Sequence, residues 1–66
     1  MRVEILLRKV RKEKGISIIT LAKKSGISKG ALSKIERGEV EPRLSTLVLL
    51  SLALKCRVDE LYKIHF

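Results

Sequence analysis

The spacing of apolar residues along the chain predicts a succession of short helices. The i, i+3, i+4, i+7 spacing of an amphipathic helix is met by Val3, Leu6, Leu7 and Val10, which indicates a helix over residues 3–14. Further helices are predicted over residues 18–25, 28–37 and 44–55, and from Val58 to about Ile64. Because no segment alternates in the manner of a strand, we expect an all-α bundle of five short helices, in one domain over residues 1–66.

The predicted helix over residues 44–55 holds more apolar residues than one buried face needs. Its expected core residues are Leu44, Leu47, Val48, Leu50 and Leu54. Leu49 and Leu52 are additional, and they lie i, i+3 apart on one face. Together with Tyr62, Ile64 and Phe66 they predict an exposed apolar patch, which favours a homodimer around a twofold axis. The alternative is that the fifth helix covers this patch within one chain.

Residues 17–38 form the most informative segment, because they predict two short helices joined by a tight turn. Ser17 and Ser28 are candidate N-caps, and Gly26 stands where the first helix must end in a left-handed conformation. Leu32 and Ile35 share the inner face of the second helix. Its outer face carries Lys29, Ser33 and Lys34, and a cationic helix of this kind fits the major groove of DNA.

The charge of the chain points to the same partner. The formal net charge is +8, and residues 8–43 carry eleven Lys and Arg against four Glu, a net +7. Residues 44–66 carry three basic against two acidic residues, a net +1. A basic region around the two short helices indicates a polyanionic partner. The alternative is a solvated basic surface that only aids solubility.

Composition excludes several classes of protein. A chain of 66 residues leaves no room for a catalytic domain, and we find no acid pair, Cys–His dyad or glycine-rich phosphate loop, so we expect no enzyme and no small-molecule ligand. The single Cys56 excludes an internal disulfide and is expected to be a small buried hydrophobe in a cytoplasmic protein. His65 is expected to fray at the C-terminus, and neither residue predicts a metal or cofactor site. No targeting or membrane-spanning segment is recognised.

The spacing of Ala22, Gly26, Leu32 and Ile35 resembles the helix-turn-helix of the phage repressor and Cro group, also called the Xre-like family. The flanks are similar as well. LLRKVRKEKGIS resembles the first helix of the family, and IERGEVEPRLSTLVLLSLAL with RVDELY resembles its later segments. The resemblance covers roughly residues 5–62, and several motifs in the right order make it specific.

The resemblance implies a set of DNA contacts. Base edges would be read from the positions of Lys29, Gly30, Ser33 and Lys34. Phosphates would be bound from the positions of Ser17, Ile18, Ser28, Arg37 and Arg43. Ile18 departs from the family, which usually has Gln there, so only its backbone N–H could take part. Gly30 leaves one reading position without a side chain.

Arg11 and Glu36 match a pair that forms an ion bridge between the first and third helices in several family members. Two interpretations stand side by side. The bridge could position the arginine close to DNA, or it could be a purely architectural clamp.

Two functions of different classes follow from the resemblance. The first is a sequence-specific transcriptional regulator, of the repressor or restriction-modification controller type, that binds a palindromic operator as a dimer. The alternative is an antitoxin-like protein that holds a partner protein and regulates its own expression through DNA. RNA binding is disfavoured, because only Tyr62 and Phe66 could stack on bases.

Overall fold

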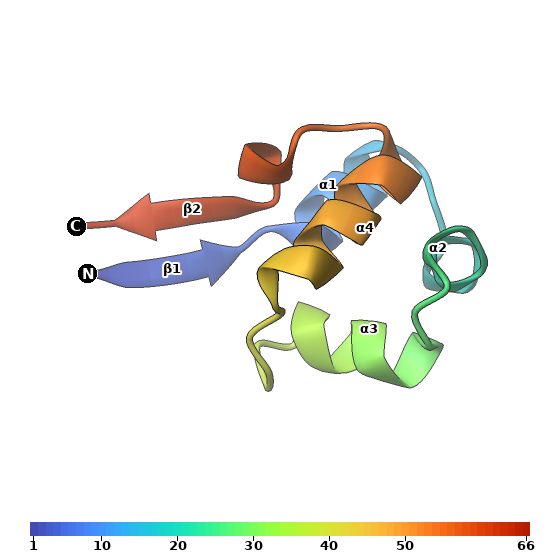
Figure 1. Ribbon diagram of the computed structural model, residues 1–66, viewed down its shortest axis with the longest axis horizontal. Coiled ribbons are helices and arrows are strands. Elements are labelled where there is room, and N and C mark those ends of the chain that lie inside the picture. Colours follow the sequence, from blue (N-terminus) through green and yellow to red (C-terminus); the bar gives the residue numbers. More distant parts are fainter.

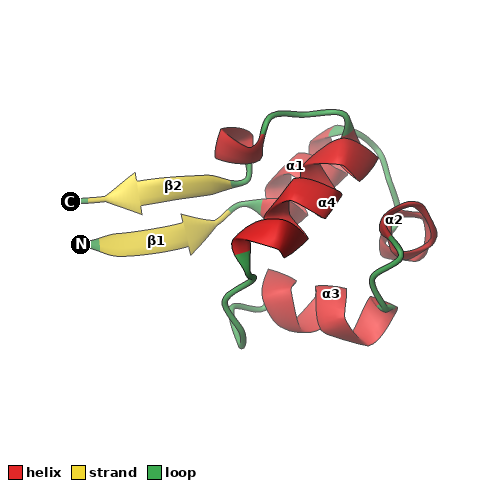
Figure 2. Ribbon diagram, viewed as in Figure 1, coloured by secondary structure: helices red, strands yellow, loops and turns green.

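The computed structural model describes all residues 1–66 and shows four α-helices beside a two-stranded sheet (Figures 1 and 2). The helices are α1 (Leu7–Glu13), α2 (Ile18–Ser25), α3 (Lys29–Glu36) and α4 (Leu44–Leu54). The strands are β1 (Arg2–Ile5) and β2 (Tyr62–His65), and the short 3-10 helix η1 (Val58–Glu60) precedes β2. The expected all-α bundle of five helices is therefore wrong, although the fold is mostly helical.

The first predicted helix, over residues 3–14, is divided between a strand and a shorter helix. β1 pairs with β2 in antiparallel register, with Val3 opposite Ile64 and Ile5 opposite Tyr62. This pairing takes the first residues out of the helix, and Leu6 continues it by donating its N–H to the carbonyl of Leu61 at 2.8 Å. The two chain termini consequently lie side by side at the end of a ribbon that projects from the helices (Figure 1).

The predicted fifth helix, from Val58 to about Ile64, is also wrong. Only the single turn η1 forms, and Leu61 then anchors the chain in the core with none of its side chain exposed. His65 is not frayed, because its Nε2 lies 2.7 Å from Oε1 of Glu4 across the ribbon. Strand pairing with the distant N-terminus therefore decides the structure of this segment.

The core is one cluster of nine buried apolar side chains drawn from the four α-helices and from the residue before β2. They are Leu7, Val10, Leu21, Leu32, Ile35, Leu47, Leu50, Leu54 and Leu61. Each fully buried leucine contributes about 1.5–3 kcal/mol relative to an exposed one, which is how so short a chain holds its helices together. Ile18, Ile27 and Cys56 are half-buried and pack against this cluster.

α4 turns fewer of its apolar residues inward than expected. Leu47, Leu50 and Leu54 are buried, but Leu44 is 70% exposed and Val48 is 40% exposed. A helix that is apolar on every side gives no signal of which face meets the core, so these two were misplaced. The helix ends at Lys55, which adopts a left-handed conformation with φ 54°.

Candidate nucleic-acid interface

α2 and α3 form the helix-turn-helix, and local signals in the sequence fix their ends. The Ser17 hydroxyl accepts the N–H of Thr20 at 3.1 Å, and the Ser28 hydroxyl accepts the N–H of Ala31 at 3.2 Å. Gly26 ends α2 with φ 74° and donates its N–H to the carbonyl of Ala22. A side chain at Gly26 would be strained by this left-handed backbone, so the turn depends on glycine.

α3 buries one side and exposes the other. Leu32 and Ile35 lie in the core, while Lys29, Gly30 and Lys34 are exposed and Ser33 is half-buried. The four residues at the expected base-reading positions thus lie on one helix, from its first residue, Lys29, to Lys34 in its last turn. A Cβ added at Gly30 would meet no atom within 4 Å, so the helix surface is open there.

The expected phosphate contacts are spread over three helix starts and one turn. The two serine hydroxyls are occupied by their own helices, but the N–H groups of Ile18 and Ile19 at the start of α2 have no partner within the chain. Arg43 stands exposed before α4 and makes no ion pair. Free N–H groups at a helix start and free cations are the groups that bind phosphate.

Arg37 differs from Arg43, because it has an intramolecular partner. Its Nε forms an ion pair with Oε2 of Glu39, and that hydrogen bond raises the pKa of the arginine. Both side chains are more than half exposed, at 58% and 51%. A phosphate would have to replace Glu39 or share the guanidinium with it. The sequence alone did not indicate this competition.

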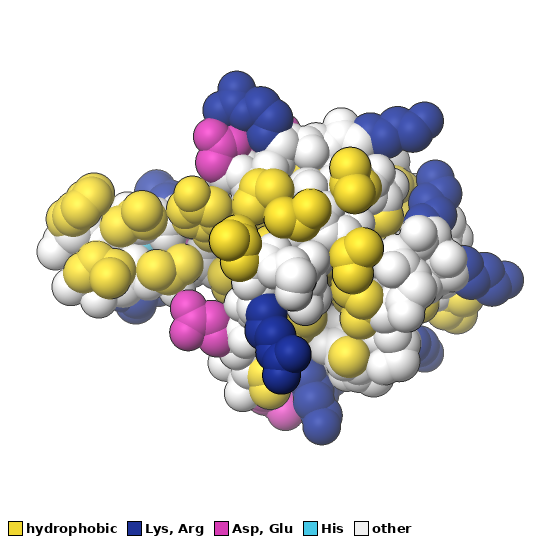
Figure 3. Space-filling view, viewed as in Figure 1, with side chains coloured by type: hydrophobic (Ala, Val, Ile, Leu, Met, Phe, Trp, Pro, Cys, Tyr) yellow, Lys and Arg dark blue, Asp and Glu magenta, His cyan; other side chains and the backbone are white.

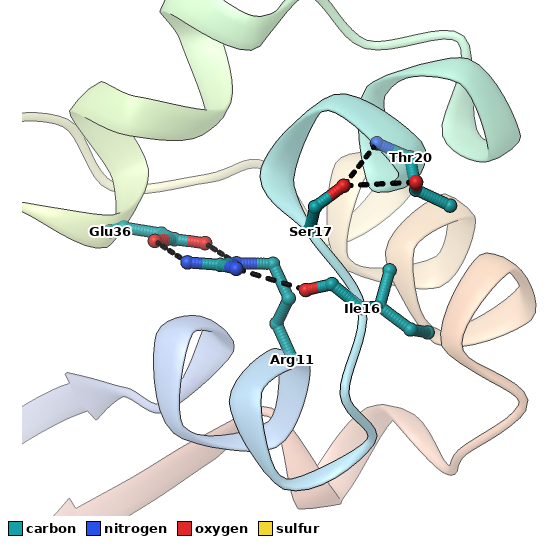
Figure 4. Close-up of polar contacts among 5 residues, drawn as sticks. All are labelled: Arg11, Ile16, Ser17, Thr20 and Glu36. Carbon is teal, nitrogen blue, oxygen red and sulfur yellow. Dashed lines mark hydrogen bonds and ion pairs between the residues drawn. The ribbon is translucent and has the colours of Figure 1, made fainter.

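Arg11 and Glu36 form a two-point ion pair beneath the helix-turn-helix (Figure 4). Nε of Arg11 lies 2.7 Å from Oε2 of Glu36, and Nη2 lies 3.0 Å from Oε1. Nη1 also donates to the carbonyl of Ile16 at 2.9 Å. Only 12% and 7% of these two side chains are exposed, so the guanidinium ties α1, α3 and the chain before α2 together.

The residues expected at a dimer interface are exposed or half-buried, and they belong to α4, β2 and the C-terminus. Leu49 is 48% exposed and Leu52 is 70% exposed on α4. Tyr62 and Ile64 lie on β2, and by register they share their side of the ribbon with Val3 and Ile5. The sequence pattern did not indicate this contribution from β1. Figure 3 shows the hydrophobic side chains running along the ribbon and over α4, with Lys and Arg gathered mainly around the helical end.

We use the name apolar face for the exposed or half-buried large apolar residues of the ribbon and of α4. They are Met1, Val3, Ile5, Leu44, Val48, Leu49, Leu52, Tyr62, Ile64 and Phe66. No fifth helix covers it, so that alternative is wrong. Ile19, 53% exposed on α2, lies in another part of the chain and nothing in the structure explains it.

Neither a metal cluster nor a membrane-spanning helix is found. No group of three His, Cys, Asp or Glu side chains converges on one point. Cys56 is half-buried, and burial raises the pKa of its thiol. No helix is long and apolar enough to cross a bilayer.

Comparison with known proteins shows which family shares this geometry. A family model described as helix-turn-helix matches residues 7–61. The HTH-type transcriptional regulator SlrR of Bacillus subtilis (strain 168) is 45% identical over 58 residues, which are 86% of this chain but only 38% of that protein. The crystal structure of the clp gene regulator ClgR from C. glutamicum superposes with a TM-score of 0.78 and 37% identity, over 82% of this chain and 70% of that one. A family of this kind agrees with the expectation of a protein that is not an enzyme.

Proposed function

Because this chain belongs to the helix-turn-helix family of the Xre and Cro type, we propose that it regulates transcription by binding double-stranded DNA at a specific sequence. The observation that carries the proposal is the outer surface of α3, where Lys29, Gly30, Ser33 and Lys34 lie together opposite the buried Leu32 and Ile35. A short helix that presents polar side chains from its first turns has the form of a major-groove recognition helix.

Lys29, Ser33 and Lys34 are proposed to read base edges. A lysine donates to O6 and N7 of guanine, and a serine hydroxyl bonds either base pair. An ammonium group lacks the planar fork of arginine, so each lysine discriminates less sharply than an arginine would. Gly30 is proposed to let the backbone of α3 approach the DNA, because its surface is open.

Phosphate contacts are proposed to supply most of the affinity. The free N–H groups at the start of α2, including that of Ile18, face an anion with the positive end of the helix. Ser17 and Ser28 hold the helix starts in place, and Arg37 and Arg43 supply charge from the turns around α3. Such contacts set the position of a protein on DNA without reading its sequence.

The ion pair of Arg11 and Glu36 is proposed to set the angle of α3 against α1. Both groups are largely buried and already hydrogen-bonded to each other, which favours the architectural interpretation over direct DNA contact. A two-point contact fixes geometry more tightly than a single ion pair does.

The protein is proposed to act as a homodimer on a palindromic operator. Leu49, Leu52, Tyr62, Ile64 and Phe66 form the proposed interface, because an apolar surface of this extent on so small a domain needs a partner. Two copies related by a twofold axis would place their α3 helices in successive major grooves, about 34 Å apart.

Selection of random duplex DNA on the purified protein tests this function directly. A palindromic consensus with half-sites centred about 10 bp apart, or a multiple of that distance, is expected. Recovery of no consensus, or of a single asymmetric site, would contradict the dimeric regulator.

The antitoxin-like function is the second candidate, and the apolar face supports it equally well, because a different protein could cover the same leucines. Isolation of the protein from its native cells distinguishes the two. A second polypeptide bound in equal amount through Leu49 and Leu52 favours the antitoxin-like function, whereas a symmetric homodimer favours the regulator.

A further inference from the structure

The first helix, α1, carries more positive charge than the proposed function uses. Residues 8–14 hold five Lys and Arg against one Glu, a net +4. Arg11 is engaged by Glu36, but Arg8, Lys9 and Lys12 are exposed and form no ion pair within the chain. Their charge is therefore free to meet an anion.

α1 runs between two elements that are proposed to bind phosphate. Near its end, Arg11 donates to the carbonyl of Ile16 at 2.9 Å, one residue before Ser17 at the N-cap of α2. Figure 4 shows Arg11 reaching from α1 toward the chain that enters α2. The start of α1 follows Ile5, which lines one groove together with Arg37 in the turn after α3. A DNA strand held by both elements would pass beside α1.

Helix geometry decides which cations of α1 turn toward this surface. Arg11 marks the direction, because it bonds α3 and the chain before α2. At 3.6 residues per turn, Arg8 lies about 60° and Lys12 about 100° round the helix from Arg11. Both lie on its solvent side, since the buried residues of α1 lie the other way round. Lys9 lies about 160° from Arg11, almost on the opposite side of the helix.

We propose that Arg8 and Lys12 bind phosphates of the DNA backbone, so that the surface in contact with DNA extends from the helix-turn-helix onto α1. This inference rests on the proposed function and adds to it a contact surface that it does not include. A free guanidinium or ammonium group binds a phosphate without reading a base. The ion pair of Arg11 with Glu36 holds α1 against α3, and with it the backbone that carries both cations.

Single variants of the full chain test this surface by fluorescence anisotropy, on the selected operator and on random duplex DNA. Arg8→Ala and Lys12→Ala should each reduce the slope of log K against log salt concentration by about one unit. Each should weaken both duplexes by the same factor, because phosphate contacts carry no sequence information. Lys9→Ala is the matched control. It removes the same charge from the same helix and should leave the slope unchanged.

Conservative variants separate the charge from the shape of the side chain. Arg8→Lys and Lys12→Arg keep the positive charge, so their slopes should equal that of the wild type. Urea unfolding checks that every variant is folded, and substitutions at these exposed positions should hardly move the midpoint.

Ethylation of single phosphates in the selected operator locates the contacts. Some ethylated phosphates should block the wild type but not the double variant with Arg8→Ala and Lys12→Ala, because ethylation removes the charge that these cations meet. Unchanged slopes in both single variants, an equal loss in Lys9→Ala, or identical ethylation patterns would overturn this inference and leave the proposed function standing. A wild type that binds no duplex DNA would overturn both.

Discussion

Arg11 and Glu36, twenty-five positions apart in the chain, meet in a two-point ion pair with Nε to Oε2 at 2.7 Å and Nη2 to Oε1 at 3.0 Å. The third donor of the guanidinium bonds the carbonyl of Ile16, two residues before α2. One side chain thus connects α1, α3 and the chain just before α2.

Removing one partner of this ion pair should therefore destabilise the protein more than removing both partners. Glu36→Ala leaves a guanidinium that is only 12% exposed without its partner, and a loss of about 3–5 kcal/mol of unfolding free energy is expected. Arg11→Met with Glu36→Leu removes both charges and should recover most of that loss. Urea unfolding measures all three proteins. A double variant no more stable than Glu36→Ala would contradict the clamp.

The ribbon should loosen in acid. The hydrogen bond from His65 lowers the pKa of Glu4 from its ordinary value of 4.5, and the charges of His65, Arg2 and Lys63 lower it further. The folded state therefore favours the ionised carboxylate more than the unfolded state does. This contribution is present above about pH 4.5 and is lost as the pH falls through the lower folded value.

Methyl NMR shifts of Val3 and Ile64, recorded from pH 7 to pH 3, report this loosening. Glu4→Gln keeps the shape of the side chain but cannot titrate, so its ribbon signals should stay constant over the acid range. Identical pH profiles in the two proteins would show that another group controls the ribbon.

Lysines on the apolar face should separate the dimer. Leu49→Lys with Leu52→Lys places two charges in the proposed interface, and sedimentation should then show a monomer at concentrations where the wild type is a dimer. Ile19→Lys is the matched control, because it adds a charge at an exposed apolar residue outside this face. The melting temperature of the wild type should rise with concentration. A monomeric wild type at high micromolar concentration contradicts the interface.

The helix-turn-helix could be predicted because its signals are local. Ser17, Gly26 and Ser28 each act on their own turn, and α2 has the predicted bounds, residues 18–25. The ends of these helices can be predicted without knowing any contact between residues far apart in the chain. The expected residues of α3 lie on one helix surface for the same reason.

The ribbon could not be predicted in this way. Val3 and Ile5 alternate with polar residues, as do Tyr62 and Ile64, but each run is only four residues long. Val3 also satisfied the helical spacing that leads to Val10. The decisive information is the pairing of Arg2 with His65, at opposite ends of the chain, and a local pattern does not contain it.

The outward side of α4 was hidden for another reason. Every turn of the helix carries leucine or valine, so periodicity does not distinguish the buried Leu47 from the exposed Leu44. Only the position of the other helices decides between them.

Variants of the cationic side chains should separate base reading from phosphate binding. Lys29→Ala and Lys34→Ala should each lower the preference for the selected operator over random DNA by about 1–3 kcal/mol. Arg43→Ala should weaken binding to the operator and to random DNA alike. It should also reduce the slope of log K against log salt concentration by about one unit. Fluorescence anisotropy measures each variant on both duplexes. If all three variants lost the same affinity on both duplexes, the lysines would contact phosphates and not base edges.

The central claim is tested most directly by two affinities of the wild-type protein. One is its affinity for the selected operator, and the other is its affinity for a scrambled duplex of equal length and base composition. Titration over a series of salt concentrations should show that log K falls steeply with the logarithm of the salt concentration on both duplexes. Each neutralised phosphate should contribute about −0.9 to this slope. At physiological salt the operator should bind at least about a thousandfold more tightly than the scrambled duplex. Equal affinities at every salt concentration, or no binding even at low salt, would contradict a sequence-specific DNA-binding regulator.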